Sequence, residues 1–170
     1  MEVQSALKHQ YHAALKTLRL VIERCPDELW DQREDERAAP FWQVAYHTLF
    51  FTHFYLQQTR DKFKAWEKGR KGVESLGRRR AADAPGESPD SDAAYTREEI
   101  LEYWRFCDEA IDTGVDRLDL SAAQCGFPWY KMPTLEHQLV NIRHIQHHAA
   151  ALAMQLRNAT GVSIEWVGRA

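Results

Sequence analysis

Apolar side chains recur every three or four residues in four separate stretches of this chain, and this spacing constrains the fold more than any other feature. Residues three and four positions apart lie on the same face of an α-helix, so each stretch predicts a helix with an apolar side. No stretch alternates apolar and polar residues in the way that indicates a strand. We therefore predict an all-α protein with four long helices.

The first two predicted helices are bounded by prolines. The first ends before Pro26, because proline cannot continue a helix. Its apolar face comprises Tyr11, Leu15, Leu18, Ile22 and Cys25. The second begins near Pro40 and is expected to run to about Trp66. Its main stripe comprises Phe41, Val44, His47, Phe51 and Phe54. Its other faces are also apolar, which is typical of a central, well-buried helix.

The last two predicted helices have clear start and stop signals. Thr96 and Glu99 form a capping box at the start of the third. Thr134 is the expected N-cap of the fourth, and Gly161 is its stop signal. The stripe of the third comprises Ile100, Trp104, Cys107, Ile111 and Leu118. The stripe of the fourth comprises Leu135, Leu139, Ile142, Ile145, Ala149, Leu152 and Leu156.

The connection between the second and third helices, residues 68–95, is rich in Gly, Ser, Pro, Asp and Arg. This composition predicts one long exposed loop. Residues 162–170 are expected to form a C-terminal tail, and residues 1–170 a single domain. Four long helices with one long connection indicate a four-helix bundle.

Charge and hydropathy exclude several classes of partner. The formal charge of −3 provides no attraction for nucleic acid or an anionic membrane. The longest apolar stretch, residues 44–56, is far shorter than the roughly 20 residues of a membrane span. The N-terminus lacks a signal-peptide pattern, so we expect a cytoplasmic protein. The three cysteines form no CxxC pair and indicate neither disulfides nor a zinc knuckle.

Two histidines near the end of the chain have the spacing of a metal site. His144 and His148 are four residues apart, so their imidazoles lie about 40° apart around a helix and can bind one metal ion. His147 is a competing partner for His144. On a helical wheel His147 lies about 175° from the apolar centre, towards solvent, which favours the pair His144 and His148.

His47 is the third candidate ligand, because it stands where the apolar stripe of the second helix calls for a hydrophobic residue. A buried imidazole needs partners for its nitrogens, so His47 is either a hydrogen-bonded core residue or a metal ligand. The His-x-x-x-His pair in the same small protein favours the ligand. Three histidines suit zinc or nickel, with iron or manganese as alternatives, and leave coordination positions open.

The remaining histidines are not expected to be ligands. His137 lies one heptad before His144 and is expected to line the mouth of the pocket, to donate a hydrogen bond to a ligand, or to be solvated. His9, His12 and His53 have no informative spacing and are expected at the surface or at an edge.

Two motifs resemble the DinB-like proteins of the DinB/YfiT superfamily. Residues 40–49, PFWQVAYHTL, resemble the second helix of that family, and residues 141–148, NIRHIQHH, resemble its fourth-helix motif. The resemblance implies a four-helix bundle that holds a divalent metal ion through the histidines at 47, 144 and 148. Many members follow the histidine pair with Arg-Gly-Gln, where this chain has three alanines at 149–151.

The resemblance also implies an activity. Members with assigned activities are mostly metal-dependent transferases that use small thiols such as bacillithiol or mycothiol. A metal ion with a free coordination position lowers the pKa of a bound thiol or water. Both thiol transfer to a small molecule and hydrolysis are therefore compatible with such a site. A non-catalytic metal-binding or stress-response protein is the alternative, and a purely structural role for the histidines is a third possibility. We expect a homodimer. The sequence identifies no catalytic base.

Overall fold

The computed structural model describes residues 3–33, 38–76 and 93–170, and within these ranges the chain contains helices and no strand. The elements are α1 (Val3–Arg24), α2 (Asp27–Trp30), α3 (Phe41–Tyr55), the 3₁₀ turn η1 (Arg60–Lys62), α4 (Arg97–Arg117) and α5 (Thr134–Thr160). The prediction of an all-α protein is confirmed for the described residues. The four-residue α2, which directly follows Pro26, has too few residues to show a period and was not predicted.

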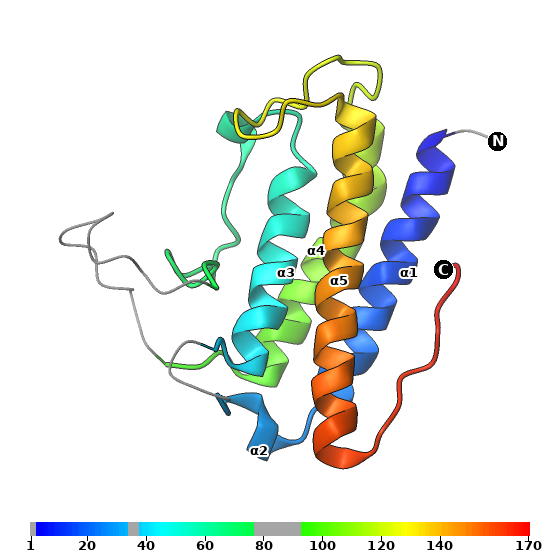
Figure 1. The fold of residues 1–170 in the computed structure, drawn as a ribbon. Coiled ribbons are helices and arrows are strands. Elements are labelled where there is room, and N and C mark those ends of the chain that lie inside the picture. Colours follow the sequence, from blue (N-terminus) through cyan, green and yellow to red (C-terminus); the bar gives the residue numbers. More distant parts are fainter. Residues whose placement is uncertain (1–2, 34–37, 77–92) are drawn as a thin grey trace.

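The four long helices lie side by side (Figure 1). Both α1 and α3 pack against α4 and against α5, so the core lies among all four. The apolar stripes of α1 and α4 are buried there, together with Cys25 and Cys107, as expected of small core residues. Cys125 is buried in a smaller cluster with Tyr55 and Phe127. No helix of the described ranges combines the length and apolar character that a membrane crossing requires.

The helix boundaries follow local signals with one exception. Thr96 caps α4, and both hydrogen bonds of the capping box with Glu99 are present. Gly161 ends α5 with a φ of 76°, a conformation that glycine adopts without strain. The prediction of Thr134 as the N-cap of α5 is wrong. Pro133 is the cap, and the Thr134 hydroxyl donates instead to the carbonyl of Gln124.

The predicted extension of the second helix to Trp66 is also wrong, because α3 ends at Tyr55. The chain turns back beyond this point, and the backbone N–H of Arg60 donates to the carbonyl of Gly126. Phe63 then packs against the side of α3, with its ring centroid 4.8 Å from that of Phe54. Phe63 therefore covers α3 from outside. This covering explains why α3 is apolar nearly all round.

At its described ends the connection at residues 68–95 has exposed residues, such as Lys68 and Ser75, and also buried ones. Val73 and Tyr95 are only 4% and 2% exposed. The amide of Gln43 on α3 donates to the carbonyls of Val73 and Ser75 and so fastens this segment to the helix. The expected exposure therefore does not hold for Val73 and Tyr95, which pack into the core. Its middle, residues 77–92, lies outside the described residues.

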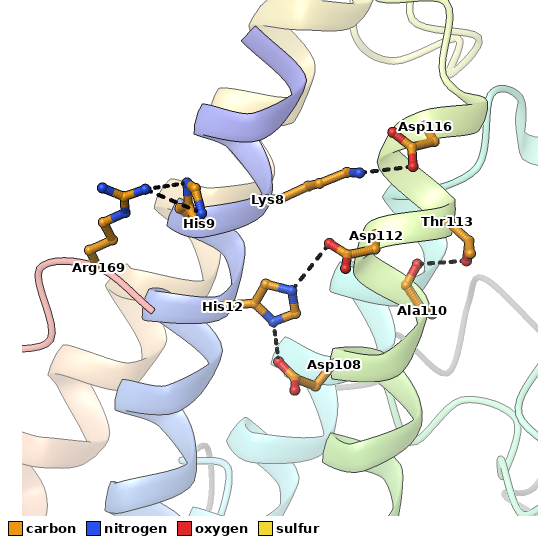
Figure 2. A network of polar contacts seen from close by, with 9 residues as sticks. All are labelled: Lys8, His9, His12, Asp108, Ala110, Asp112, Thr113, Asp116 and Arg169. Atoms are coloured by element: carbon orange, nitrogen blue, oxygen red, sulfur yellow. Dashed lines mark hydrogen bonds and ion pairs between the residues drawn. The ribbon is translucent and has the colours of Figure 1, made fainter. Parts of the chain in front are cut away.

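A line of polar contacts closes the seam between α1 and α4 (Figure 2). Lys8 pairs with Asp116 at 2.8 Å. His12 lies between two aspartates of α4, with Nδ1 2.7 Å from Asp108 and Nε2 3.5 Å from Asp112. These partners account for the polar side chains of the seam, and they support the prediction that His12 is not a ligand of the histidine site.

The C-terminal segment, residues 162–170, runs back along α1 (Figure 1). Its backbone carbonyls at Ser163 and Gly168 accept hydrogen bonds from Arg24 and Gln10 of α1. Arg169 lies 3.4 Å from the ring of His9 (Figure 2). The tail is therefore attached at both of its ends to α1.

Candidate metal centre

His47 of α3 lies beside His144 and His148 of α5. One ring nitrogen from each of the three lies within 4.8 Å of the other two, and Nε2 of His47 is 3.0 Å from Nε2 of His144. Across residues 3–33, 38–76 and 93–170, no other group of three histidine, cysteine or acidic side chains converges in this way. The structure thus brings together the three residues that the sequence selected.

The donor set of the three histidines fits a metal ion. Nδ1 of His47 is 2.6 Å from the backbone carbonyl of Glu74. A carbonyl oxygen only accepts, so Nδ1 of His47 carries the hydrogen and Nε2 presents a lone pair towards His144. Two nitrogens bound to one zinc ion are about 3.3 Å apart, close to the 3.0 Å between His47 and His144. Nδ1 of His144 is buried without a partner among the described residues.

The electrostatics of the site keep the histidines neutral. Burial, reinforced by His148 and His47, lowers the pKa of His144 to about 3. Burial is also the main cause that lowers the pKa of His148 to about 4. Burial lowers the pKa of His47 as well, against the opposing effect of its bond to Glu74. A metal ion binds the neutral imidazole, so no proton competes for these nitrogens near pH 7.

Two polar side chains of α5 set its position against α3. The last carbonyls of a helix lack partners within the helix. The amide of Asn141 donates to the carbonyl of Thr52, and that of Gln138 donates to the carbonyl of Tyr55. The hydroxyl of Tyr11 on α1 donates to Gln138 at 2.6 Å. These bonds lie one to two turns from His144 and hold α5 in register with α3, so that the three histidines meet.

The roles of Gln138 and Asn141 were not predicted from the sequence. Both lie on the same face of α5 as the buried residues Ile145, Ala149 and Leu152. Polar residues that continue an apolar face, close to the end of a neighbouring helix, are the signal that could have identified them.

The stripe that contains His47 is only partly buried. Phe41 at its start is a core residue, whereas Val44, His47, Phe51 and Phe54 are half-buried. His47 is therefore not a fully buried core residue, and together with Phe51 it lines a pocket.

A pocket of about 740 Å³ opens beside the histidines. It is lined by His47, Phe51, Tyr55, Tyr130, Val140, Arg143, His144, Gln146, His147 and Ala150. Tyr130 lies in the connection that precedes α5. Trp166 is 77% exposed and lines a different hollow near the C-terminus. A pocket of this size accommodates a small organic molecule next to two of the three histidines.

The other histidines occupy distinct positions. His147 is exposed at the pocket rim and does not belong to the converging trio. His53 is buried, so its prediction as a surface residue is wrong; its ring packs against Phe63 and Phe106. His137 is fully buried, so a solvated position is excluded. Neither ring nitrogen of His137 has a partner among the described residues.

His137 lies behind the pocket wall, packed against three aromatic rings. Its ring centroid is 4.6 Å from that of Tyr55 and 5.0 Å from those of Phe127 and Tyr130. Tyr55 and Tyr130 also line the pocket. His137 therefore packs against the wall and does not belong to the converging trio.

Acid is expected to destabilise the protein through its buried histidines. Burial lowers the pKa of His137 and of His53 from 6.5 to about 4. Between these values the unfolded chain binds protons that the folded protein does not, so the free energy of unfolding falls as the pH falls from about 6.5 to about 4. At pH 5 each of these two histidines should lower the free energy of unfolding by about 2 kcal/mol relative to its value at pH 8.

The His137→Phe variant tests this expectation by urea unfolding of metal-free protein at pH 8 and pH 5. Between pH 8 and pH 5 the free energy of unfolding of the variant should fall by about 2 kcal/mol less than that of the wild type. At pH 8 the variant should be at least as stable as the wild type, because phenylalanine suits the aromatic surroundings. Equal pH dependence in the two proteins would contradict the assignment.

Comparisons with known proteins agree with this geometry. The sequence pattern of the DinB superfamily matches residues 10–152 of the chain, which include all three histidines of the trio. The match covers α3 and α4 completely, α1 except for its first seven residues and α5 except for its last eight. No curated protein matches the chain.

Proposed function

The chain belongs to the DinB superfamily, and from that premise we propose that it is a four-helix-bundle enzyme that transfers a small thiol, of the bacillithiol or mycothiol type, to an electrophilic small molecule. The observation that carries this proposal is the pocket of about 740 Å³ beside His47 and His144. A site that served only to store or to sense a metal ion would not need space for an organic molecule.

In this proposal His47, His144 and His148 hold one divalent ion, with zinc or nickel best suited to three imidazoles. When bound, such an ion lowers the pKa of a thiol and so supplies a thiolate at neutral pH. The backbone carbonyl of Glu74 fixes the ring of His47 through Nδ1, which leaves Nε2 for the ion.

In this proposal the wall of the pocket orients the two reactants. Phe51, Tyr55 and Tyr130 provide an aromatic surface on which the organic part of a substrate can lie. In the reaction the thiolate sulfur forms a bond to an electrophilic carbon, the leaving group departs with its electron pair, and the proton of the thiol passes to solvent. Holding sulfur and carbon next to each other is the main contribution of the pocket.

A fluorogenic assay tests the proposal. Zinc-loaded and nickel-loaded protein is incubated with monochlorobimane and, in turn, bacillithiol, mycothiol and cysteine. We expect the loaded wild type to conjugate at least one thiol roughly a hundred-fold faster than the metal-free protein does, in line with the contribution of an activated nucleophile. The His148→Ala variant should fall to the metal-free rate.

Fully loaded protein that shows no rate above background with any of these thiols would contradict thiol transfer. The same preparations can be tested with ester and amide substrates, because a water molecule in place of the thiol would give hydrolysis. Hydrolysis without thiol transfer would replace the proposed reaction with the other one that the site allows.

A further inference from the structure

The pocket beside the histidine trio combines apolar and polar lining residues. Phe51, Tyr55, Tyr130 and Val140 are apolar in whole or in large part, and Arg143, Gln146 and His147 are the polar residues outside the trio. None of the ten lining residues is an aspartate or a glutamate. The lining thus carries a positive group and no negative one.

Arg143 is the charged group of the rim, and it is exposed on α5 directly before His144. Its guanidinium has no hydrogen bond or ion pair with any residue in the part of the chain that the structure describes. Of the ten other arginines that the structure describes, six have such a partner; for example, Arg19 pairs with Glu23, and Arg97 pairs with Asp27. An arginine that lines a pocket without a partner is available to a ligand, and its planar guanidinium matches a carboxylate through two parallel hydrogen bonds.

The histidine trio adds to this positive character. Three neutral imidazoles contribute no negative charge, so a divalent ion held by them would keep its full charge of two. No acidic residue of the lining would offset it. A ligand that enters the pocket is therefore favoured if it is an anion, with or without the ion, because Arg143 is charged in both cases.

We propose that the pocket binds an organic carboxylate with an aromatic or apolar body, and that Arg143 is the residue that selects the carboxylate. The body of the ligand lies against Phe51, Tyr55 and Tyr130, and its carboxylate pairs with the guanidinium of Arg143 at the rim. As the substrate class of the enzyme this rests on the proposed thiol transfer, but the binding itself does not depend on turnover.

Binding of 2-naphthylacetate and of its uncharged analogue 2-naphthylacetamide tests the proposal. Both are titrated into metal-free and zinc-loaded protein, with ¹H–¹⁵N chemical shifts as the readout. The wild type should bind the carboxylate at least about ten-fold more tightly than the amide in both forms, which corresponds to one charge-assisted pair. The shifts should be largest for backbone groups of the pocket.

Three variants identify the group responsible. Arg143→Gln should weaken carboxylate binding about ten-fold and leave amide binding within two-fold, whereas Arg143→Lys should retain part of the preference because it keeps the charge but not the planar fork. Arg157→Gln is the matched control, since Arg157 is an exposed arginine of the same helix outside this pocket. It should behave as the wild type.

Two outcomes would overturn the proposal: equal affinity of the wild type for the two probes, or an undiminished carboxylate preference in Arg143→Gln. A preference that occurs only in zinc-loaded protein and survives in Arg143→Gln would assign the anion to the ion instead of to Arg143. Failure of the thiol assay would leave these titrations unaffected, so the two proposals fail separately. Displacement of the probe by N-acetylcysteine would place the carboxylate on the thiol substrate, and simultaneous binding would place it on the electrophile.

Discussion

Replacing His144 by alanine is expected to abolish stoichiometric metal binding. His144 lies close to both other members of the trio, with Nε2 3.0 Å from that of His47 and its ring 4.6 Å from that of His148. Loss of a hydrogen bond that only orients a ligand costs about 10- to 100-fold in metal affinity, so loss of a ligand should cost at least about 100-fold. Protein purified without a histidine tag should contain about one ion per chain, and His144→Ala less than a tenth of that.

Unfolding measurements give a second readout of the same prediction. Zinc at 100 times its dissociation constant should raise the free energy of unfolding of the wild type by about 2.7 kcal/mol. The His144→Ala variant should gain almost nothing at that zinc concentration. His147→Ala is the matched control, because His147 lies on the same helix at the pocket rim but outside the trio. A wild type that takes up neither zinc nor nickel, or a His147→Ala variant that loses metal equally, would refute the site.

The pair on α5 could be predicted from the sequence because a single helix determines its geometry. Spacing of four residues fixes the relative direction of His144 and His148 once the segment is helical, and α5 is an uninterrupted helix from Thr134 to Thr160. The exposure of His147 follows from the same wheel. By contrast, His47 stands in the apolar stripe of the second helix, and the structure shows it half-buried beside a pocket. The stripe drew attention to this residue, but a pocket formed by α3, α5 and a loop could not be predicted from one helix.

Features that depend on contacts between elements could not be predicted. The segment after α3 continues with aromatic residues, and whether Phe63 and Trp66 extend the helix or fold back on it depends on neighbours far away in the chain. The burial of His53 follows from that fold-back, since Phe63 covers it. Local periodicity has no information on such coverage. The homodimer and the cytoplasmic location stay predictions from the sequence.

Replacing Gly126 by alanine is expected to destabilise the protein strongly and to disturb the pocket wall. Gly126 has a φ of 80°, and an added Cβ would overlap the carbonyl oxygen of Gln58 and lie 2.9 Å from Cα of Thr59. Because these are backbone atoms, the segment that follows α3 and the loop that carries Tyr130 must move apart. The left-handed backbone costs about 1–2 kcal/mol and the displacement adds to it, so we expect a loss of about 3 kcal/mol and a fall in Tm of roughly 6–12 °C.

Gly161→Ala separates the two contributions to this loss. Gly161 also has a positive φ, of 76°, but an added Cβ would meet nothing within 4 Å. This variant should lose only the backbone term of about 1–2 kcal/mol. If the two alanine variants lose the same free energy of unfolding, the close approach between Gly126 and residues 58–59 does not contribute to the loss. We expect Gly126→Ala to be the less stable variant and also to bind 2-naphthylacetate more weakly at a temperature where it is folded. This result would show that packing of the loop with Gly126 and Tyr130 against the end of α3 keeps Tyr130 in the pocket wall.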